Sequence, residues 1–253
     1  MSVNVEKKDR LLTVTWDKPP LNVLDIVLLR ELDEILQSCA ANPTVDVVVL
    51  RGQGPKAFSA GVDIKDHTQE KVPEMLAVIH GVIRKLVGLP QVTIAAVRGA
   101  CLGGACEVAS VCDFIVASEE SSFATPEILV GCYPPVALAR FAPLIGYHRA
   151  AEMILTGRRF SAREAQAMGL INRVFADGDL EAGIASLVGE LLSKSGAVMR
   201  LTVKGLRELS LRDFDASLKR SEQIYRDELL RTADVEEGVQ AFLQKRAPQW
   251  RHR

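Results

Sequence analysis

Apolar and polar residues alternate over 11–16 (LLTVTW), and this spacing of two predicts a β-strand. The run 45–52 (VDVVVLRG) is short and β-branched, which indicates a strand buried on both faces. The run 91–99 (QVTIAAVRG) is a further predicted strand. Between these strands, apolar residues recur at helical spacing over 21–40 and 71–89. Strands that alternate with helices predict crossover connections, and therefore an α/β core.

The second half of the chain has a different pattern. DFIVAS (113–118) is the last clear strand, and from about residue 145 onward the strand signal nearly disappears. GYHRAAEMILTG (146–157), SAREAQAMG (161–169) and the long stretch 180–246 are predicted to be helical. We therefore expect a helical region after the α/β core, packed on that core or on a neighbouring subunit.

Composition and charge exclude several classes of protein. Of the 253 residues, 48% are hydrophobic and 25% are charged, and the formal net charge is -1. This balance gives no general attraction to nucleic acid or to an anionic membrane. The sequence opens without a leader pattern and has no apolar run long enough to span a bilayer, so we expect a cytoplasmic protein. The five cysteines have no C-x-x-C spacing and the four histidines form no ligand pair, so we expect free buried thiols and no metal site.

A glycine-rich segment, RGQGPKA (51–57), has the pattern G-x-G-x-x-A of a weak dinucleotide-binding motif. That motif should open a helix, but Pro55 interrupts it and another turn follows at once. We therefore predict no nicotinamide or flavin site. The chain also lacks the G-x-S-x-G of serine hydrolases and the lysine of a P-loop.

Two glycine turns are candidates for holding a negative charge. Ala60–Gly61 allows a tight turn whose N–H groups can bind an oxyanion, although taken alone it could simply end a strand. Gly103–Gly104 lies where a helix should begin, so free N–H groups there would face a developing negative charge. Glu107 follows about one helical turn later and can point to the same place.

Two acidic residues complete this set. Glu107 lies among small and apolar residues, where an ionised carboxylate is costly unless it is paired or functional. Glu127 follows a proline in FATPEILVG (123–131), and taken alone it would be an exposed acid at a helix start. Two N–H clusters together with two carboxylates suit chemistry that passes through an enolate.

Four segments together resemble the crotonase superfamily, the enoyl-CoA hydratases and isomerases. They are AFSAGVDIK (57–65), AVRGACLGGACEVASVCDF (96–114), ATPEILVG (124–131) and TGRRFSAREAQAMGLINRV (156–174). The likeness extends from KPPLNVL near residue 18 to FLQKRAP near 248. It implies an α/β catalytic core of repeated β-β-α units over 1–190. It also implies a C-terminal helical region over 191–253 for oligomerisation and for completing the coenzyme A (CoA) site.

The resemblance also implies a role for each candidate residue. The backbone N–H groups of Val62 and Gly104 would form an oxyanion hole for a thioester carbonyl. Glu107 would mainly take a proton from water, and Glu127 would mainly protonate carbon 2. The substrate-binding residues would be Lys56, Ala60, Asp63, Ile64, Pro135, Phe242 and Lys245, the last two often reaching a neighbour's CoA.

One segment departs from the family pattern. Many relatives have P-G-x-G-G after the second glutamate, whereas this chain has YPPVALAR (133–140). Pro135 stands where a glycine N–H often helps to hold the catalytic water, and proline has no N–H. We therefore expect the water to be held otherwise and the pocket wall to be stiff. The PPVA loop resembles that of the hydratases of cyclohexa-1,5-diene-1-carbonyl-CoA.

The implied activity is the hydration of an α,β-unsaturated acyl-CoA, because isomerases of the family often keep only the acid at the Glu127 position. A short linear or branched enoyl-CoA is an alternative substrate. Isomerisation, thioester hydrolysis or decarboxylation on the same scaffold, and RNA binding, are alternative functions. The resemblance implies no cofactor apart from the CoA of the substrate, no nucleic acid or membrane partner, and a homo-oligomer, either a trimer or a hexamer formed as a dimer of trimers.

Overall fold

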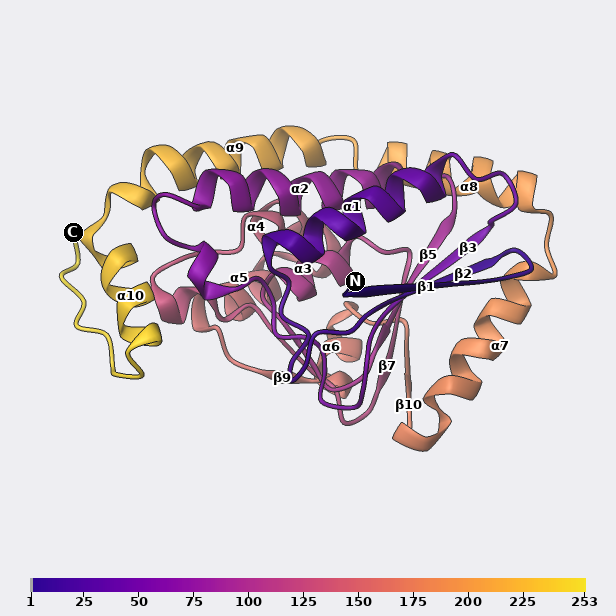
Figure 1. Ribbon diagram of the computed structural model, residues 1–253, viewed down its shortest axis with the longest axis horizontal. Helices are drawn as coiled ribbons and strands as arrows, with labels where there is room; N and C mark the ends of the chain where they lie inside the picture. Colours follow the sequence, from indigo (N-terminus) through magenta and orange to yellow (C-terminus); the bar gives the residue numbers. More distant parts are fainter. Residues whose placement is uncertain (1) are drawn as a thin grey trace.

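The computed structural model describes residues 2–253 and contains two β-sheets (Figure 1). The larger sheet has the strand order β1-β2-β3-β5-β7-β10, and the smaller has the order β4-β6-β8-β9. The pairs β1–β2 and β8–β9 are antiparallel, and the other neighbouring pairs are parallel. The strands are β1 (Val3–Lys8), β2 (Leu11–Trp16), β3 (Val47–Gly52), β4 (Ala57–Ser59), β5 (Val92–Val97), β6 (Ala100–Leu102), β7 (Phe114–Ser118), β8 (Ser122–Ala124), β9 (Phe160–Ser161) and β10 (Arg173–Phe175).

Successive units of two strands and a helix build both sheets at once. In the units β3-β4-α2 and β5-β6-α3, the first strand joins the large sheet and the second joins the small sheet. The strands β7 and β8 repeat this division, and the short 3-10 helix η2 and then α4 follow them. The prediction of repeated β-β-α units is confirmed. The helices of these units are α2 (Val72–Gly88), α3 (Gly104–Ser110), η2 (Pro126–Val130) and α4 (Pro135–Ile145).

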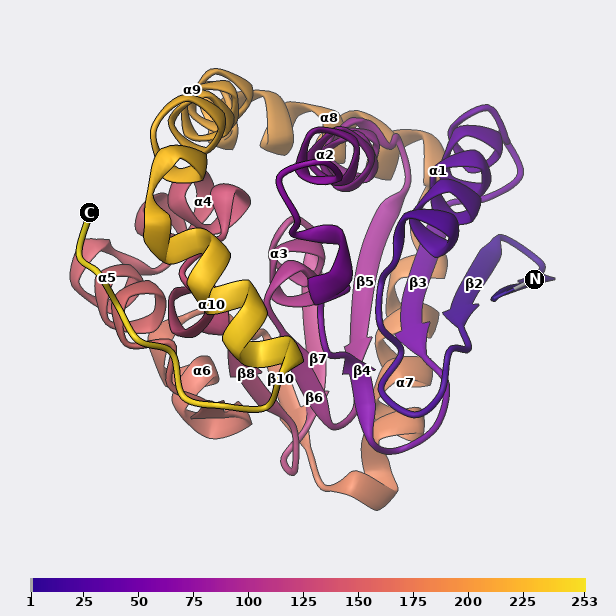
Figure 2. The same ribbon diagram turned by 60° about the vertical axis from the view of Figure 1, so that its left-hand side comes forward.

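Both faces of the large sheet are covered, as Figure 2 shows for α1 and α2 on one side and α7 on the other. Side chains of β3 alternate between two apolar cores because successive residues of a strand point to opposite faces. Val48 and Leu50 belong to the core on the α1 and α2 side, and Val47 and Val49 to the core below α7 and α8. The predicted burial of this strand on both faces is confirmed. The covering helices are α1 (Ile26–Ala40), α7 (Leu180–Leu192) and α8 (Gly196–Ser210).

The C-terminal helices pack on the core of their own chain. Helix α9 contacts α4 and α2, and α10 contacts η2 and the 3-10 helix η1. Figure 1 shows α10 at the end of the molecule opposite α7. The remaining helices are η1 (Ile64–Asp66), α5 (Tyr147–Thr156), α6 (Ala162–Met168), η3 (Asp177–Asp179), α9 (Phe214–Asp227), η4 (Leu229–Arg231) and α10 (Ala233–Leu243).

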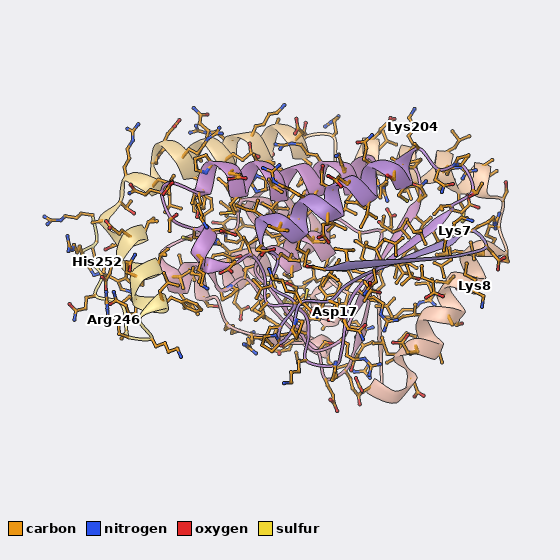
Figure 3. All side chains as sticks on the ribbon, in the orientation of Figure 1. Lys7, Lys8, Asp17, Lys204, Arg246 and His252 are labelled. Carbon is orange, nitrogen blue, oxygen red and sulfur yellow. The ribbon has the colours of Figure 1, made fainter. Side chains whose placement is uncertain are left out.

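The last residues fold back along α10. Arg246 pairs with Glu237 at 2.5 Å, and the backbone N–H groups of Arg251 and His252 donate to the Asp234 carboxylate at 2.6 and 2.8 Å. Arg246 and His252 lie at this end of the molecule in Figure 3. An acidic first turn in α10 suits this arrangement, because its carboxylates are stabilised by the positive end of the helix dipole.

The sequence pattern does not predict several of the observed strands. Strand β1 has only two apolar residues, Val3 and Val5, so its alternation is too short to detect, and its pairing with β2 places it at the edge of the sheet. The strands β4, β6 and β8 have three residues each, too few for a period to appear. Strands β9 and β10 lie after residue 145, where the pattern predicts almost no strand, and the helix predicted over 21–40 begins at Ile26. The other helix and strand predictions named above are confirmed. Within residues 2–253, no helix combines the length and hydropathy needed to cross a membrane.

Candidate active site

The candidate site lies where three strands of the small sheet end. Since β4, β6 and β8 are parallel neighbours, their carboxyl ends share one edge, the edge at which α/β sheets place ligands. Val62 follows β4, Gly104 follows β6, and Glu127 follows β8. Glu107 lies in the first turn of α3, which begins at Gly104. The topology therefore brings together residues from three segments that are far apart in the sequence.

Two backbone N–H groups at this edge are available to a ligand. In residues 2–253, the bridge between Leu24 and Val62 uses Gly61 O and Asp63 N, and no hydrogen bond uses Val62 N. Gly104 is the first residue of α3, so its N–H has no acceptor within the helix. A methyl group on Gly104 would lie 3.7 Å from Val62 N, so the two N–H groups are close together. This pair is suited to binding one oxyanion.

Both glycine turns have conformations that few other residues adopt. Gly61 has φ of +94° and Gly103 has φ of +55°. A methyl group on Gly103 would lie 2.6 Å from Oε1 of Glu127, well inside van der Waals contact. Glycine at 103 is therefore required both by the backbone turn and by the carboxyl group that lies against it.

The side chain of Glu107 is buried and held in one orientation. The residue is 4% exposed, and the backbone N–H of Ala137 at the start of α4 donates to Oε1 at 2.9 Å. Burial raises the pKa of this carboxyl to about 7, although hydrogen bonds from the backbone act in the opposite direction. Glu107 is thus a carboxyl group that can gain or lose a proton near neutral pH.

Glu127 belongs to η2, and its carboxyl group is also buried. Oε2 has no hydrogen-bond partner in residues 2–253. Its pKa lies well above the ordinary value, first because of burial and then because of the negative charge of Glu107. Taken alone, Glu127 would be an exposed acid at a helix start, and this expectation is wrong because its carboxyl group is buried. The pair favours a state in which Glu107 is ionised while Glu127 keeps its proton.

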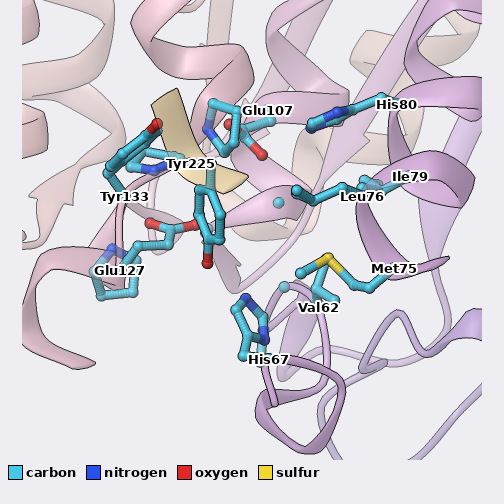
Figure 4. Close-up of a pocket in the computed structure, with 17 residues that line it drawn as sticks. Val62, His67, Met75, Leu76, Ile79, His80, Glu107, Glu127, Tyr133 and Tyr225 are labelled. Carbon is cyan, nitrogen blue, oxygen red and sulfur yellow. The ribbon is translucent and has the colours of Figure 1, made fainter. Parts of the chain in front are cut away.

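These groups line a cavity of about 90 Å³, shown in Figure 4. Helix α2 provides an apolar wall with Met75, Leu76 and Ile79. Six of the predicted site residues also line the cavity: Ala60, Val62, Gly104, Glu107, Glu127 and Pro135. The other five predicted binding residues, Lys56, Asp63, Ile64, Phe242 and Lys245, are not among the residues lining it.

Pro135 has a different structural role from the one expected. It is the first residue of α4 and not part of a loop. Proline is favoured at this position, because the first N–H of a helix has no intrahelical acceptor and φ is already fixed near the helical value. The N–H that the segment supplies to the site comes from Ala137, two residues later, and it binds Glu107.

The C-terminal region contributes residues to its own chain's cavity that the sequence pattern did not indicate. Tyr225 of α9 is 1% exposed and lines the cavity, and its ring packs edge-on against that of Tyr133 at 5.0 Å between centroids. The hydroxyl group of Tyr133 donates to Ser221 O of α9 at 2.8 Å. His80 of α2 also lines the cavity. Helical periodicity places these side chains on a buried face, but only the tertiary packing directs that face to the site.

The cysteines and the metal-binding types of side chain provide no second candidate site within residues 2–253. All five cysteines are free and buried, as predicted, and burial raises the pKa of Cys39 to about 11. In that part of the chain, no group of three or more His, Cys, Asp or Glu side chains is placed to hold a metal ion.

The two sheets and the glycine turns at Gly61 and Gly103 define a class of proteins whose site can stabilise an anionic intermediate. The sequence model of the Enoyl-CoA hydratase/isomerase family matches residues 6–253, and the chain belongs to this family, the crotonase superfamily. Its activity is therefore of the enoyl-CoA hydratase/isomerase type.

Individual relatives match over almost their whole length. A probable enoyl-CoA hydratase of Rhizobium meliloti is 36% identical, and the match covers 98% of this chain and 97% of the relative. A cyclohexa-1,5-dienecarbonyl-CoA hydratase of Thauera aromatica is 29% identical, with 100% and 97% covered. The crystal structure of an enoyl-CoA hydratase from Mycobacterium avium subsp. paratuberculosis superposes with a TM-score of 0.90 at 28% identity, covering 99% and 98% of the two chains.

Proposed function

We propose that this protein adds water to a 2-enoyl-CoA thioester. The observation that carries the proposal is the pair of buried carboxyl groups with unequal pKa values beside two free N–H groups. A base and an acid are both needed to add H and OH across a double bond. The pair can supply one of each at the same pH.

In the proposed mechanism, the N–H groups of Val62 and Gly104 bind the thioester oxygen. Ionised Glu107 takes a proton from water while the water oxygen bonds to carbon 3. The electron pair of the double bond moves to the carbonyl oxygen, which becomes the enolate that the two N–H groups stabilise. Protonated Glu127 then gives its proton to carbon 2 and the thioester carbonyl re-forms. The net change is the addition of one water molecule.

The pH dependence should reflect the two carboxyl groups. We expect kcat/KM for hydration to rise as the pH increases through about 7, because Glu107 must lose its proton to act as the base. It should fall again at a higher pH, where Glu127 loses the proton it must donate. Steady-state rates from pH 5 to 10 measure both limbs. A profile that falls as the pH rises through 7 would contradict the assignment of Glu107.

We further propose a compact, cyclic dienoyl group as the preferred acyl group. Support comes from the small cavity, from the rigid Pro134–Pro135 pair that lines it, and from the likeness to the Thauera aromatica hydratase. A rigid wall suits a flat ring and adapts poorly to a long flexible chain. The 36% identical relative is a probable enoyl-CoA hydratase, and a short linear or branched enoyl-CoA is the competing substrate.

A comparison of substrates tests this choice. We expect kcat/KM to be highest for cyclohexa-1,5-diene-1-carbonyl-CoA and to fall steeply with linear chain length, and Pro135→Gly to shift the preference towards crotonyl-CoA. Pro143→Ala changes another proline of α4 that does not line the cavity, and it should leave the preference unchanged. A wild-type preference for crotonyl-CoA of about tenfold, which is about 1.4 kcal/mol, would exclude the cyclic assignment but not hydration.

The CoA part of the substrate is proposed to lie along Lys56, Asp63 and Ile64, outside the acyl cavity. Helix α10 packs against η1, so Phe242, near the end of α10, and Lys245, two residues after that helix, follow an element that borders this segment in the same chain. Phe242 is 57% exposed, which leaves its ring available for contact with an adenine or with a second subunit. A homo-oligomer remains our expectation for the assembly.

A further inference from the structure

His80 is a buried polar residue of the cavity that the proposed mechanism does not use. It lies on α2 with 0% exposure, in the same turn as Ile79 of the apolar wall. Figure 4 shows its ring extending from α2 toward the cavity, beside the Glu107 side chain in this view. A polar ring at this position interrupts a surface that would otherwise suit an alkyl group.

One nitrogen of this ring is fixed by the C-terminal region. Nδ1 lies 2.6 Å from Oε1 of Glu222 on α9. Arg84 holds the same carboxylate oxygen, with its Nη2 donating at 2.9 Å, and Arg84 is itself paired with Asp215 at 2.8 Å. Three charged side chains therefore orient one imidazole.

The charges of Glu222 and Arg84 determine which nitrogen of the His80 ring carries the proton. Burial by itself would raise the pKa of Glu222, but the bonds to His80 and Arg84 bring it below its ordinary value, so Glu222 is ionised. Burial lowers the pKa of His80 and outweighs the carboxylate, while the positive charges of Arg84 and Arg226 act in the same direction as burial. The imidazole is neutral at pH 7, and Nδ1 donates its hydrogen to Glu222.

The other nitrogen, Nε2, is then left with a lone pair. In residues 2–253 it has no hydrogen-bond partner, although it is buried. An unsatisfied buried acceptor is costly, so a ligand that supplies a donor is favoured over one that does not. The matching group is an O–H, since an anionic carboxylate would repel this lone pair.

We propose that Nε2 of His80 accepts a hydrogen bond from a hydroxyl group on the acyl part of the ligand, so that the site favours hydroxylated acyl-CoA thioesters over alkyl ones of the same skeleton. This inference rests on the proposed acyl-CoA function and deepens it. Sites that hydrogen-bond a substrate hydroxyl discriminate strongly against analogues that lack it, because the protein group is then left unpaired.

Binding of saturated thioesters tests the inference without requiring hydration. We would titrate the protein with matched pairs by calorimetry: 4-hydroxybutanoyl-CoA against pentanoyl-CoA, 5-hydroxypentanoyl-CoA against hexanoyl-CoA, and 4-hydroxycyclohexanecarbonyl-CoA against its 4-methyl analogue. The wild type should bind the hydroxylated member of at least one pair about tenfold more tightly or better. His80→Phe should abolish or reverse that preference, and His80→Leu repeats the test with a different shape.

His67→Phe is the matched control, because it removes the other histidine that lines the cavity and should leave the preference ratio as it is. A wild type without preference in any pair overturns the inference, and so does a preference that survives both His80 variants. Hydration of crotonyl-CoA is measured in parallel. Hydration without hydroxyl preference disproves the inference alone, whereas hydroxyl preference without hydration disproves the proposed function alone.

Discussion

Glu127→Gln is expected to lower kcat for hydration by about 10²- to 10⁴-fold, the usual contribution of a general acid. Glutamine has nearly the same shape as glutamate but no acidic proton to give to carbon 2. Stopped-flow or steady-state assays of hydration measure the loss, and calorimetric titration with a saturated acyl-CoA measures binding, which should change little. Near-wild-type turnover in this variant would remove Glu127 from the mechanism.

Glu107→Gln is expected to reduce kcat by a similar factor, and it has a second, independent readout in stability. The pKa of Glu107 is about 7 in the folded protein against an ordinary value of 4.5, so the folded state holds this proton more tightly. Unfolding free energy should therefore decrease as the pH rises from about 4.5 to 7, by about 3 kcal/mol from this group. The decrease between pH 5 and 8 should be smaller in the variant, because only Glu127 then remains as a buried carboxyl group with a raised pKa, and denaturant titrations at the two pH values would show the difference.

A structural role for the two acids would give a different result. Loss of activity would then accompany loss of folded protein, and the activity of each folded molecule would be unchanged. Circular dichroism and the elution volume of each variant distinguish the two cases.

Gly103→Ala should also have a large effect, through the geometry of the site and not through its acids. The added methyl group would lie 2.6 Å from Oε1 of Glu127, and the residue has a positive φ. The backbone or the Glu127 carboxyl group must move, and either shift disturbs the acid and the adjacent Gly104 N–H together. Since loss of one oxyanion donor costs about 10²- to 10³-fold in rate, we expect kcat to fall by at least about 10²-fold.

Gly205→Ala provides the matched control. Gly205 lies within α8, away from the site, and outside its own stretch of helix a methyl group there would meet no atom of residues 2–253 within 4 Å. It should leave kcat unchanged and stabilise the helix by up to about 1 kcal/mol. A Gly103→Ala enzyme that is as active as this control would show that the close packing of Gly103 and Glu127 is not needed.

The sequence predicts the architecture where a pattern is long enough to show a period. Helix α2 and strand β3 are examples, because 17 and 6 residues, respectively, reveal which faces are buried. The turns at Gly61 and Gly103 and the two glutamates are also recognisable, since glycine and a buried acid have few structural uses in such places.

The parts of the site that depend on distant packing could not be predicted. Tyr225 and Glu222 lie on a strongly amphipathic helix with nothing local to separate a cavity wall from an ordinary core contact. His80 is a single imidazole in an apolar run, and its partner is 142 residues away. The prediction of a loop at Pro135 is wrong because two consecutive prolines suggest a turn, whereas the first of them precedes the helix and the second begins it.

The contribution of α9 also determines when the site is complete during synthesis. The chain is synthesised at about 5–20 residues per second. Both glutamates and both glycine turns have therefore left the ribosome long before Tyr225 and Glu222 are made. Until then, the nascent core carries its carboxyl pair in a cavity without its final wall, and the ring of His80 lacks its carboxylate. Burial of the acids, which raises their pKa values, is therefore complete only when the last quarter of the chain docks.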